Sequence, residues 1–242
     1  MISTQKKMLV AALLMALVGG TVRGSDVIPP PSLAPEAWVK ANGGNVDDVN
    51  AKVNVYSMPV SLMYLAAREG RLDVLVWLKE RGAKINDEDG TMHWAAFNGH
   101  IEIMKWLKTQ DVDVNAKDPN GERPMHFAAG RGQIEVMKWL KEQGADVNTK
   151  GWRNQTPMYS TVGNSRIEAM KWLKAQGADV NVKNNEGWTP MHIAARNSRV
   201  EAMKRLKEQG ADINAKTNDG WTPLYGAHMG EARTWLLANG AE

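Results

Sequence analysis

The sequence predicts an all-α solenoid of stacked repeats, in which every repeat contributes two helices. The first observation behind this prediction is a period of 33 residues that two series of residues share. One series is His126, Tyr159, His192 and Tyr225, and the other is Trp106, Trp139, Trp172 and Arg205. A fixed period of this length indicates supersecondary units that cannot bury their apolar faces alone and therefore stack on one another.

The first helix of each unit is expected to begin at a proline that follows the same period. Proline suits the first turn of a helix because its fixed φ fits there and its missing N–H costs nothing. These prolines are Pro124, Pro157, Pro190 and Pro223. Thr156, Thr189 and Thr222 precede three of them, and a threonine hydroxyl in this position can cap the helix.

The second helix is predicted from apolar spacing, as in residues 133–143. Ile134, Met137 and Leu140 fall on one helical face, and the charged residues Glu135, Lys138 and Glu142 are expected to face water. A glycine then ends the helix, because glycine adopts the left-handed C-cap conformation most easily. The glycines in this position are Gly82, Gly144, Gly177, Gly210 and Gly240.

The segments GWTPMHIAA (187–195) and RVEAMKRLKEQGADINAK (199–216) resemble the ankyrin repeat, whose signature is T-P-L-H-x-A at a 33-residue period. The resemblance implies an ankyrin-like α-solenoid in which each unit is a β-hairpin loop followed by two antiparallel helices. It covers about residues 36–242, which we expect to form one ankyrin repeat domain. We count about six units after an N-terminal capping half repeat around Trp38 and Val39. Their loops end at Tyr64, His93, His126, Tyr159, His192 and Tyr225.

The N-terminal segment 1–24 has the pattern of a secretory signal peptide. Lys6 and Lys7 precede the apolar run 8–18, and small residues follow it. Cleavage after Gly20 or after Gly24 fits this pattern, and the alternative is that the segment is kept as an anchor. The apolar run is too short to span a bilayer. We expect an extracytoplasmic protein, periplasmic or secreted and bacterial, with a proline-rich linker over 25–35.

The charge of the mature chain argues against a nucleic-acid partner. The full chain has 30 basic and 27 acidic residues, and cleavage after Gly24 removes Lys6, Lys7 and Arg23 but no acidic residue. The formal charge then falls from +3 to zero, so the chain lacks the excess of Lys and Arg that phosphate contacts need. We also expect a monomer without stable membrane insertion after signal cleavage.

No residue set for catalysis or metal binding can be assembled from the sequence. The chain has no cysteine, which excludes disulfides, thiolate nucleophiles and thiolate zinc sites. His93, His126 and His192 share one repeat position with tyrosines, so this position requires a ring with a hydrogen-bonding tip and not a metal ligand. Motifs for a serine nucleophile or a phosphate-binding loop are missing from the sequence. We therefore expect no enzyme activity, no metal and no cofactor.

The resemblance implies that a partner protein binds on the concave face, against the hairpin tips and the exposed side of the first helices. The residues that map to this face are Arg68, Glu69, Phe97, Asn98, Arg131, Trp152, Arg153, Gln155, Asn164, Glu186, Trp188, Arg196, Asn197, Asp219 and Trp221.

The fourth hairpin, KGWRNQTP (150–157), departs most from its siblings and places Trp152 and Arg153 at its tip. Aromatic residues and arginine are favoured at binding hot spots, so this hairpin is the strongest candidate for a partner contact. Residues 160–162 behind it replace the small apolar residues of other units, and we expect looser packing there. Trp188 and Trp221 also lie beside hairpins, where they either contact a partner or only brace neighbouring loops.

Two other functions remain open at this point. The loop tryptophans are also suited to a glycan or small ligand, because a flat ring can stack on a sugar face. An exported chain of this kind could also be a secreted factor that acts on another organism. A broad mixed surface would favour a protein partner, whereas a concave pocket with converging polar groups would favour a small ligand.

Overall fold

The structure is a computed structural model that describes residues 33–55, 58–85, 90–228 and 230–242. The expected signal peptide (1–24) and most of the expected linker (25–35) lie outside these ranges. The linker prediction needs one correction, because Pro35 begins the helix α2 (Pro35–Ala41) and is not part of an extended segment. Proline fits the first position of that helix for the same reason as in the repeats.

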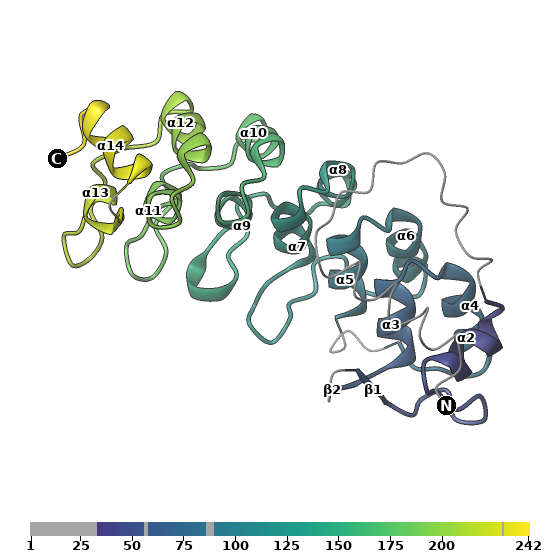
Figure 1. Ribbon diagram of the computed structural model, residues 1–242. Helices are drawn as coiled ribbons and strands as arrows, with labels where there is room; N and C mark the ends of the chain where they lie inside the picture. Colours follow the sequence, from purple (N-terminus) through teal and green to yellow (C-terminus); the bar gives the residue numbers. More distant parts are fainter. Residues whose placement is uncertain (1–32, 56–57, 86–89, 229) are drawn as a thin grey trace, which may run out of the picture.

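The helices alternate between two layers that run side by side along the molecule (Figure 1). The first-helix layer contains α3 (Leu62–Arg68), α5 (Thr91–Asn98), α7 (Pro124–Arg131), α9 (Pro157–Gly163), α11 (Pro190–Arg196) and α13 (Pro223–Gly226). The second-helix layer contains α4 (Leu72–Glu80), α6 (Ile101–Thr109), α8 (Ile134–Glu142), α10 (Ile167–Ala175), α12 (Val200–Glu208) and α14 (Glu231–Ala238). Neighbouring helices contact one another throughout the first-helix layer and from α6 to α14 in the second-helix layer, so the predicted all-α solenoid is confirmed.

The hairpin loops project from the side of the first-helix layer that is turned away from the second helices (Figure 1). The first loop contains β1 (Val53–Val55) and β2 (Met58–Val60), an antiparallel pair in which Val53 is opposite Val60. A short 3-10 helix, η2 (Trp152–Asn154), forms the tip of the fourth loop. This side of the first-helix layer and its loops, which correspond to the expected concave face, are called the first-helix face below.

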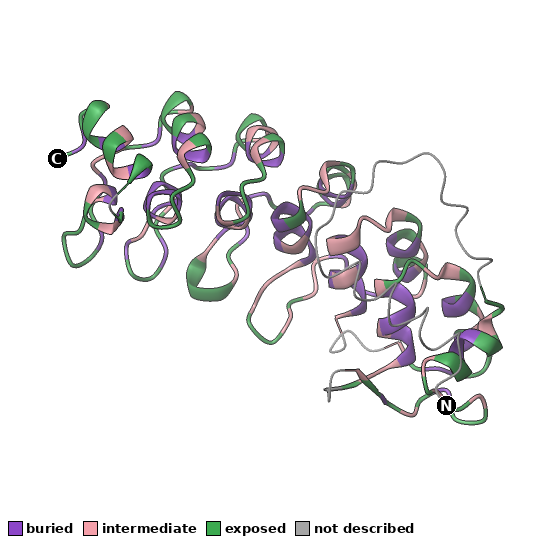
Figure 2. Ribbon diagram, in the orientation of Figure 1, coloured by how far each residue is buried: buried purple, intermediate pink, exposed green. Residues whose placement is uncertain are grey.

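The core lies between the two helix layers and is built from the residue positions that the period predicts (Figure 2). The second helices α6, α8, α10 and α12 each supply a methionine and a leucine, and these side chains are fully buried. They are Met104, Leu107, Met137, Leu140, Met170, Leu173, Met203 and Leu206. Because burial of one such side chain stabilises the fold by about 1.5–3 kcal/mol, this repeated pair supplies much of the stability of these four units.

A ladder of asparagines joins the end of one unit to the next. Asn148 donates from Nδ2 to the carbonyl of Gly177 (3.1 Å), and its Oδ1 accepts a bond from the backbone N–H of Asp179 (3.0 Å). Asn181 makes the same two contacts in the following unit. Each asparagine thus satisfies a carbonyl and an N–H in the turn after the second helix of its neighbour, which stabilises the stacking of adjacent repeats.

The start of the first helix differs from the expected threonine cap. Thr156 and Thr222 occupy the N-cap position with extended backbone angles, but neither hydroxyl caps a helix N–H. At the start of α7 and α11, the imidazole Nδ1 of His126 or His192 accepts the N-cap N–H, which Thr189 donates at 3.1 Å in α11. At α11 the Thr189 side chain takes part in the same capping box. In these two units the histidine ring therefore shares in organising the helix start, a role that the sequence prediction gave to the threonine alone.

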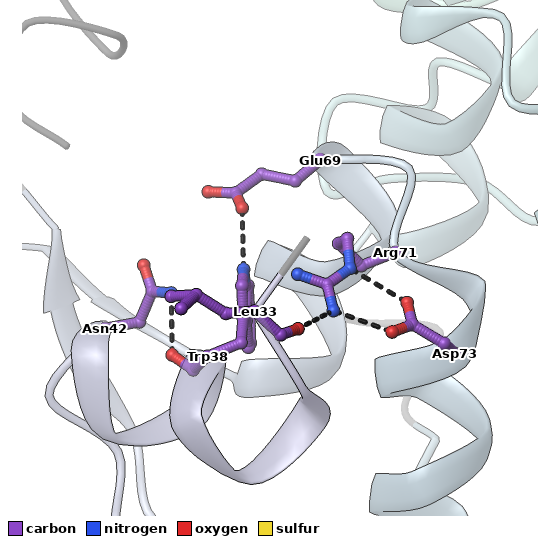
Figure 3. A network of polar contacts seen from close by, with 6 residues as sticks. All are labelled: Leu33, Trp38, Asn42, Glu69, Arg71 and Asp73. Carbon is purple, nitrogen blue, oxygen red and sulfur yellow. Dashed lines mark hydrogen bonds and ion pairs between the residues drawn. The ribbon is translucent and has the colours of Figure 1, made fainter. Parts of the chain in front are cut away.

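The helix α2 covers the N-terminal end of the solenoid and buries Trp38 and Val39. Its polar contacts to the first full repeat are drawn in Figure 3. The indole Nε1 of Trp38 donates to the Glu69 carboxylate at 2.9 Å. Arg71 donates to the Leu33 carbonyl and forms an ion pair with Asp73. These contacts attach α2 to the segment between α3 and α4, so the first full repeat does not expose its apolar end.

Candidate interaction surface

Four aromatic side chains from the first three units meet on the first-helix face and form what we call the aromatic cluster: Tyr64, Trp94, Phe97 and Phe127. The ring centroid of Trp94 lies 5.8 Å from Tyr64, 5.1 Å from Phe97 and 6.2 Å from Phe127. All three pairs have edge-to-face geometry, which is favoured by about 0.5–1.5 kcal/mol per pair beyond area burial. Each of the four side chains is half-buried. The cluster is therefore an ordered apolar patch that is partly open to solvent.

Two arginines flank the aromatic cluster. The guanidinium of Arg131 lies 4.7 Å from the ring centroid of Phe97, and that of Arg68 lies 5.9 Å from the ring of Trp94. Burial raises the pKa of the Tyr64 hydroxyl, and the neighbouring Arg68 guanidinium opposes this shift. The arginines are held over aromatic faces, which leaves guanidinium N–H groups available for further hydrogen bonds.

The C-terminal units carry a second set of rings on the same face. The guanidinium of Arg196 lies 5.0 Å from the ring of Trp188, and Trp188 also contacts the ring of His192. The rings of Trp221 and Tyr225 are stacked at 4.8 Å, and these side chains are 42% and 66% exposed. The first-helix face therefore combines apolar rings with arginine both in its first three units and in its last two.

The last four hairpins share one backbone hydrogen bond and are called the third to sixth fingers. In each, the N–H of the first turn residue donates to the carbonyl four residues later, over residues 118–122, 151–155, 184–188 and 217–221. The sixth finger is joined to the fifth because the backbone N–H of Asn218 donates to the Glu186 carbonyl (3.1 Å). The fingers thus form a connected row along the first-helix face.

The fourth finger has the unusual backbone that its sequence suggests. Arg153 and Asn154 both have positive φ, at 52° and 61°, which is a strained conformation for residues with side chains. The Arg153 guanidinium lies 4.3 Å from the ring of Trp152 and pairs with Glu186 of the fifth finger. Trp152 is 47% exposed. Arg153 therefore links the fourth finger to the fifth, whereas the Trp152 side chain remains largely exposed at the tip.

The predicted loosening behind the fourth finger is not seen. Thr161 and Val162 are buried, at 1% and 0% exposure, like the alanines of other units. The Thr161 hydroxyl donates to the Met158 carbonyl at 2.7 Å, so its polar group is satisfied within α9. A hydroxyl that bonds its own helix fits a buried position without opening a gap.

The polar residues predicted for this face fall into two groups. Asn98 and Asn164 donate to carbonyls of their own helices, from Nδ2 to the oxygens of Trp94 and Ser160. The backbone carbonyl of Gln155 lies 3.2 Å from Nε2 of His126. These contacts, like the Glu69 contact to Trp38, are internal to the fold. Asn197 and Asp219 are exposed.

The repeated histidines are structural, as the sequence predicts. His126 and His192 are 2% and 1% exposed, and their Nε2 atoms lie within hydrogen-bond distance of carbonyls in the next finger. Tyr159 makes the equivalent contact, from its hydroxyl to the Trp188 carbonyl at 2.6 Å. Burial lowers the pKa of His126 from 6.5 to about 4 and also lowers the pKa of His192, so both rings are neutral at pH 7. Across the described ranges, no three His, Asp or Glu side chains form a group that could hold a metal ion.

A family model described as ankyrin repeats (3 copies) matches three overlapping stretches, residues 62–151, 92–184 and 158–242. The chain belongs to the ankyrin repeat family. Ankyrin repeats generally mediate protein–protein interaction, and the family is typically a non-catalytic scaffold. No curated protein matches the chain.

The first-helix face contains four exposed or half-buried rings that the predicted binding residues did not include: Tyr64, Trp94, Phe127 and Tyr225. Trp94 and Phe127 occupy equivalent positions, directly after the histidines of their units, His93 and His126, which belong to the series with the 33-residue period. The other four units hold Leu65, Ser160, Ile193 and Gly226 there, so the repeats share no chemistry at this position. Only the stacking of adjacent first helices brings the rings together.

None of the helices in the described ranges of this ankyrin chain has both the length and the apolar character that crossing a bilayer requires.

Proposed function

We propose that this ankyrin protein is an exported scaffold that binds another protein on its first-helix face. The observation that carries the proposal is the combination of half-buried and exposed rings with arginines on one continuous side of the solenoid. Aromatic residues and arginine dominate the binding energy of protein interfaces, and a fixed scaffold loses little conformational entropy on binding.

The protein-binding part of the proposal is tested by cross-linking and affinity capture from an extracytoplasmic fraction. A variant with Trp221→Ala and Tyr225→Ala is the comparison, because both rings are exposed and their loss leaves the buried core intact. A partner that is captured by the native chain and lost with the variant supports the proposal. Equal capture by both chains, or capture only of a polysaccharide, would contradict it.

The export part of the proposal is supported by Lys6, Lys7 and the apolar run 8–18. We expect the chain outside the cytoplasm, with a new N-terminus at Thr21 or Ser25. N-terminal sequencing and intact mass of the protein from separated cell fractions test this directly. A cytoplasmic protein that begins at Met1 would refute export without affecting the interaction proposal.

A further inference from the structure

The charged residues of the solenoid are divided unequally between the two helix layers. In the described first helices, the charged side chains are Arg68, Arg131 and Arg196, and these helices contain no lysine, aspartate or glutamate. Each second helix contains both acidic and basic residues, and many of these form ion pairs within the helix, such as Lys138 with Glu135. The helical part of the first-helix face is therefore purely cationic, although residues 25–242 as a whole have a formal charge of zero.

The three arginines are ordered but not neutralised. Each guanidinium lies over an aromatic ring, at 5.9 Å for Arg68, 4.7 Å for Arg131 and 5.0 Å for Arg196. Other arginines in the described structure do pair with carboxylates, as Arg153 does with Glu186 and Arg205 with Glu201. Over the same residues, no ion pair involves the three ring-stacked arginines.

Several carboxylates on or beside this face make contacts within the fold, whereas Asp219 in the sixth finger is exposed. Glu69 accepts the Trp38 indole N–H, and Asp118 accepts the backbone N–H groups of Asn120 and Glu122 within the third finger. Burial raises the pKa of the Glu122 carboxyl, which reflects its packing against the fourth finger. Glu186 is paired with Arg153. An incoming carboxylate would therefore find guanidinium donors that the protein's own acids do not already occupy.

We infer that the partner segment on the first-helix face is an acidic stretch of polypeptide with apolar side chains between its carboxylates. The inference rests on the proposed function and names the chemistry of its partner. A guanidinium binds a carboxylate with two parallel hydrogen bonds, and the adjoining rings provide apolar contact. Because Arg68, Arg131 and Arg196 lie in α3, α7 and α11, the segment runs along the solenoid and contacts units from the first to the fifth.

The test uses the full chain and a library of random-sequence peptides long enough to cross several repeats. Selected peptides are sequenced, and their affinities are measured for three proteins: the native chain, R68Q/R131Q/R196Q, and the matched control K105Q/K138Q/K171Q. The control removes the same number of positive charges from α6, α8 and α10, where Lys105 and Lys138 are exposed and Lys171 is half-buried. Each of these lysines forms an ion pair with a glutamate of its own helix. Melting curves check that both variants remain folded.

We expect selected peptides rich in Asp and Glu with Leu, Phe or Trp between them. Their affinity should fall about tenfold or more in the arginine variant, stay within about twofold in the lysine control, and weaken with added salt. Peptides without acidic enrichment whose binding survives the arginine variant but is lost with Phe127→Ala would overturn this inference and leave the proposed function standing. Binding that depends on neither the arginines nor the rings would overturn both. A sulfated polysaccharide that binds through the arginines, while acidic peptides do not, would also overturn the inference.

Discussion

At the scale of single residues, the ring that recurs every 33 residues connects one unit to the next finger. His126 and Tyr159 both reach a carbonyl of the following loop, so an imidazole and a phenol perform the same task. The sequence predicted a ring with a hydrogen-bonding tip, because the two ring types alternate at one position, but it did not identify the carbonyl of the next loop as the partner. It did not predict that the imidazole Nδ1 would also accept the N-cap N–H, since that contact depends on the rotamer and the local backbone.

The burial of the His126 imidazole predicts that the free energy of unfolding depends on pH. An ordinary histidine with a pKa of 6.5 takes up a proton in the unfolded chain, whereas His126 in the folded protein resists protonation until about pH 4. The unfolded state therefore binds more protons between these values, and stability falls as the pH drops from about 6.5 to 4, by at most about 3 kcal/mol for this residue. His126→Tyr should remain stable at pH 7 and lose less stability at pH 5 than the native protein. Denaturant titrations at both values measure this, and equal losses in the two proteins would contradict it.

A second residue-scale prediction concerns Asp111, which stands where other units have glycine after the second helix. Its φ is 63°, in the left-handed region, and the equivalent Gly144 has φ of 89°. An aspartate side chain tolerates this region less well than glycine. Asp111→Gly should raise the free energy of unfolding by roughly 0.5–1 kcal/mol, measured by denaturant titration. Gly144→Asp is the reciprocal control and should lower it.

At the scale of secondary-structure elements, the sequence predicted the helices, their glycine ends and their buried faces. These features depend on periodicity and on backbone preferences that each residue carries by itself. The aromatic cluster could not be predicted in the same way. Trp94 and Phe127 occupy equivalent positions in the second and third units, but the fourth unit has Ser160 there. Only the contact between stacked helices shows that the two rings belong to one cluster.

The fourth finger offers a prediction that separates binding from bracing. Trp152 is exposed, whereas Arg153 joins the fourth and fifth fingers through Glu186. Trp152→Ala together with Arg153→Ala should weaken partner binding by about 2 kcal/mol or more, with little change in the unfolding midpoint. Glu186→Gln is the matched control, because it removes the same ion pair but keeps Trp152. If Glu186→Gln weakens binding as much as the double variant does, the finger acts by positioning its neighbours and Trp152 is not a hot spot.

At the scale of the whole molecule, stability is distributed along a line of units that contact only their neighbours. The asparagine ladder and the packing within each layer couple adjacent repeats, and no described contact joins the two ends. Such a solenoid unfolds according to the stability of each unit and of each interface between neighbours. A leucine-to-alanine cavity should therefore change the unfolding transition differently in the middle and at the end of the solenoid.

Leu140 and Leu236 provide this comparison, because they occupy equivalent positions in α8 and α14 and both are 0% exposed. Leu140→Ala should cost about 2–5 kcal/mol and lower the midpoint of the main unfolding transition, since it opens a cavity in a unit with neighbours on both sides. The terminal unit has a single neighbour, and its first helix, α13, is only four residues long. Leu236→Ala should therefore fray α13 and α14 first and leave the main midpoint nearly unchanged. Denaturant titration with hydrogen exchange resolves the two behaviours. Equal shifts of the main midpoint would mean that the solenoid unfolds as one cooperative unit from end to end.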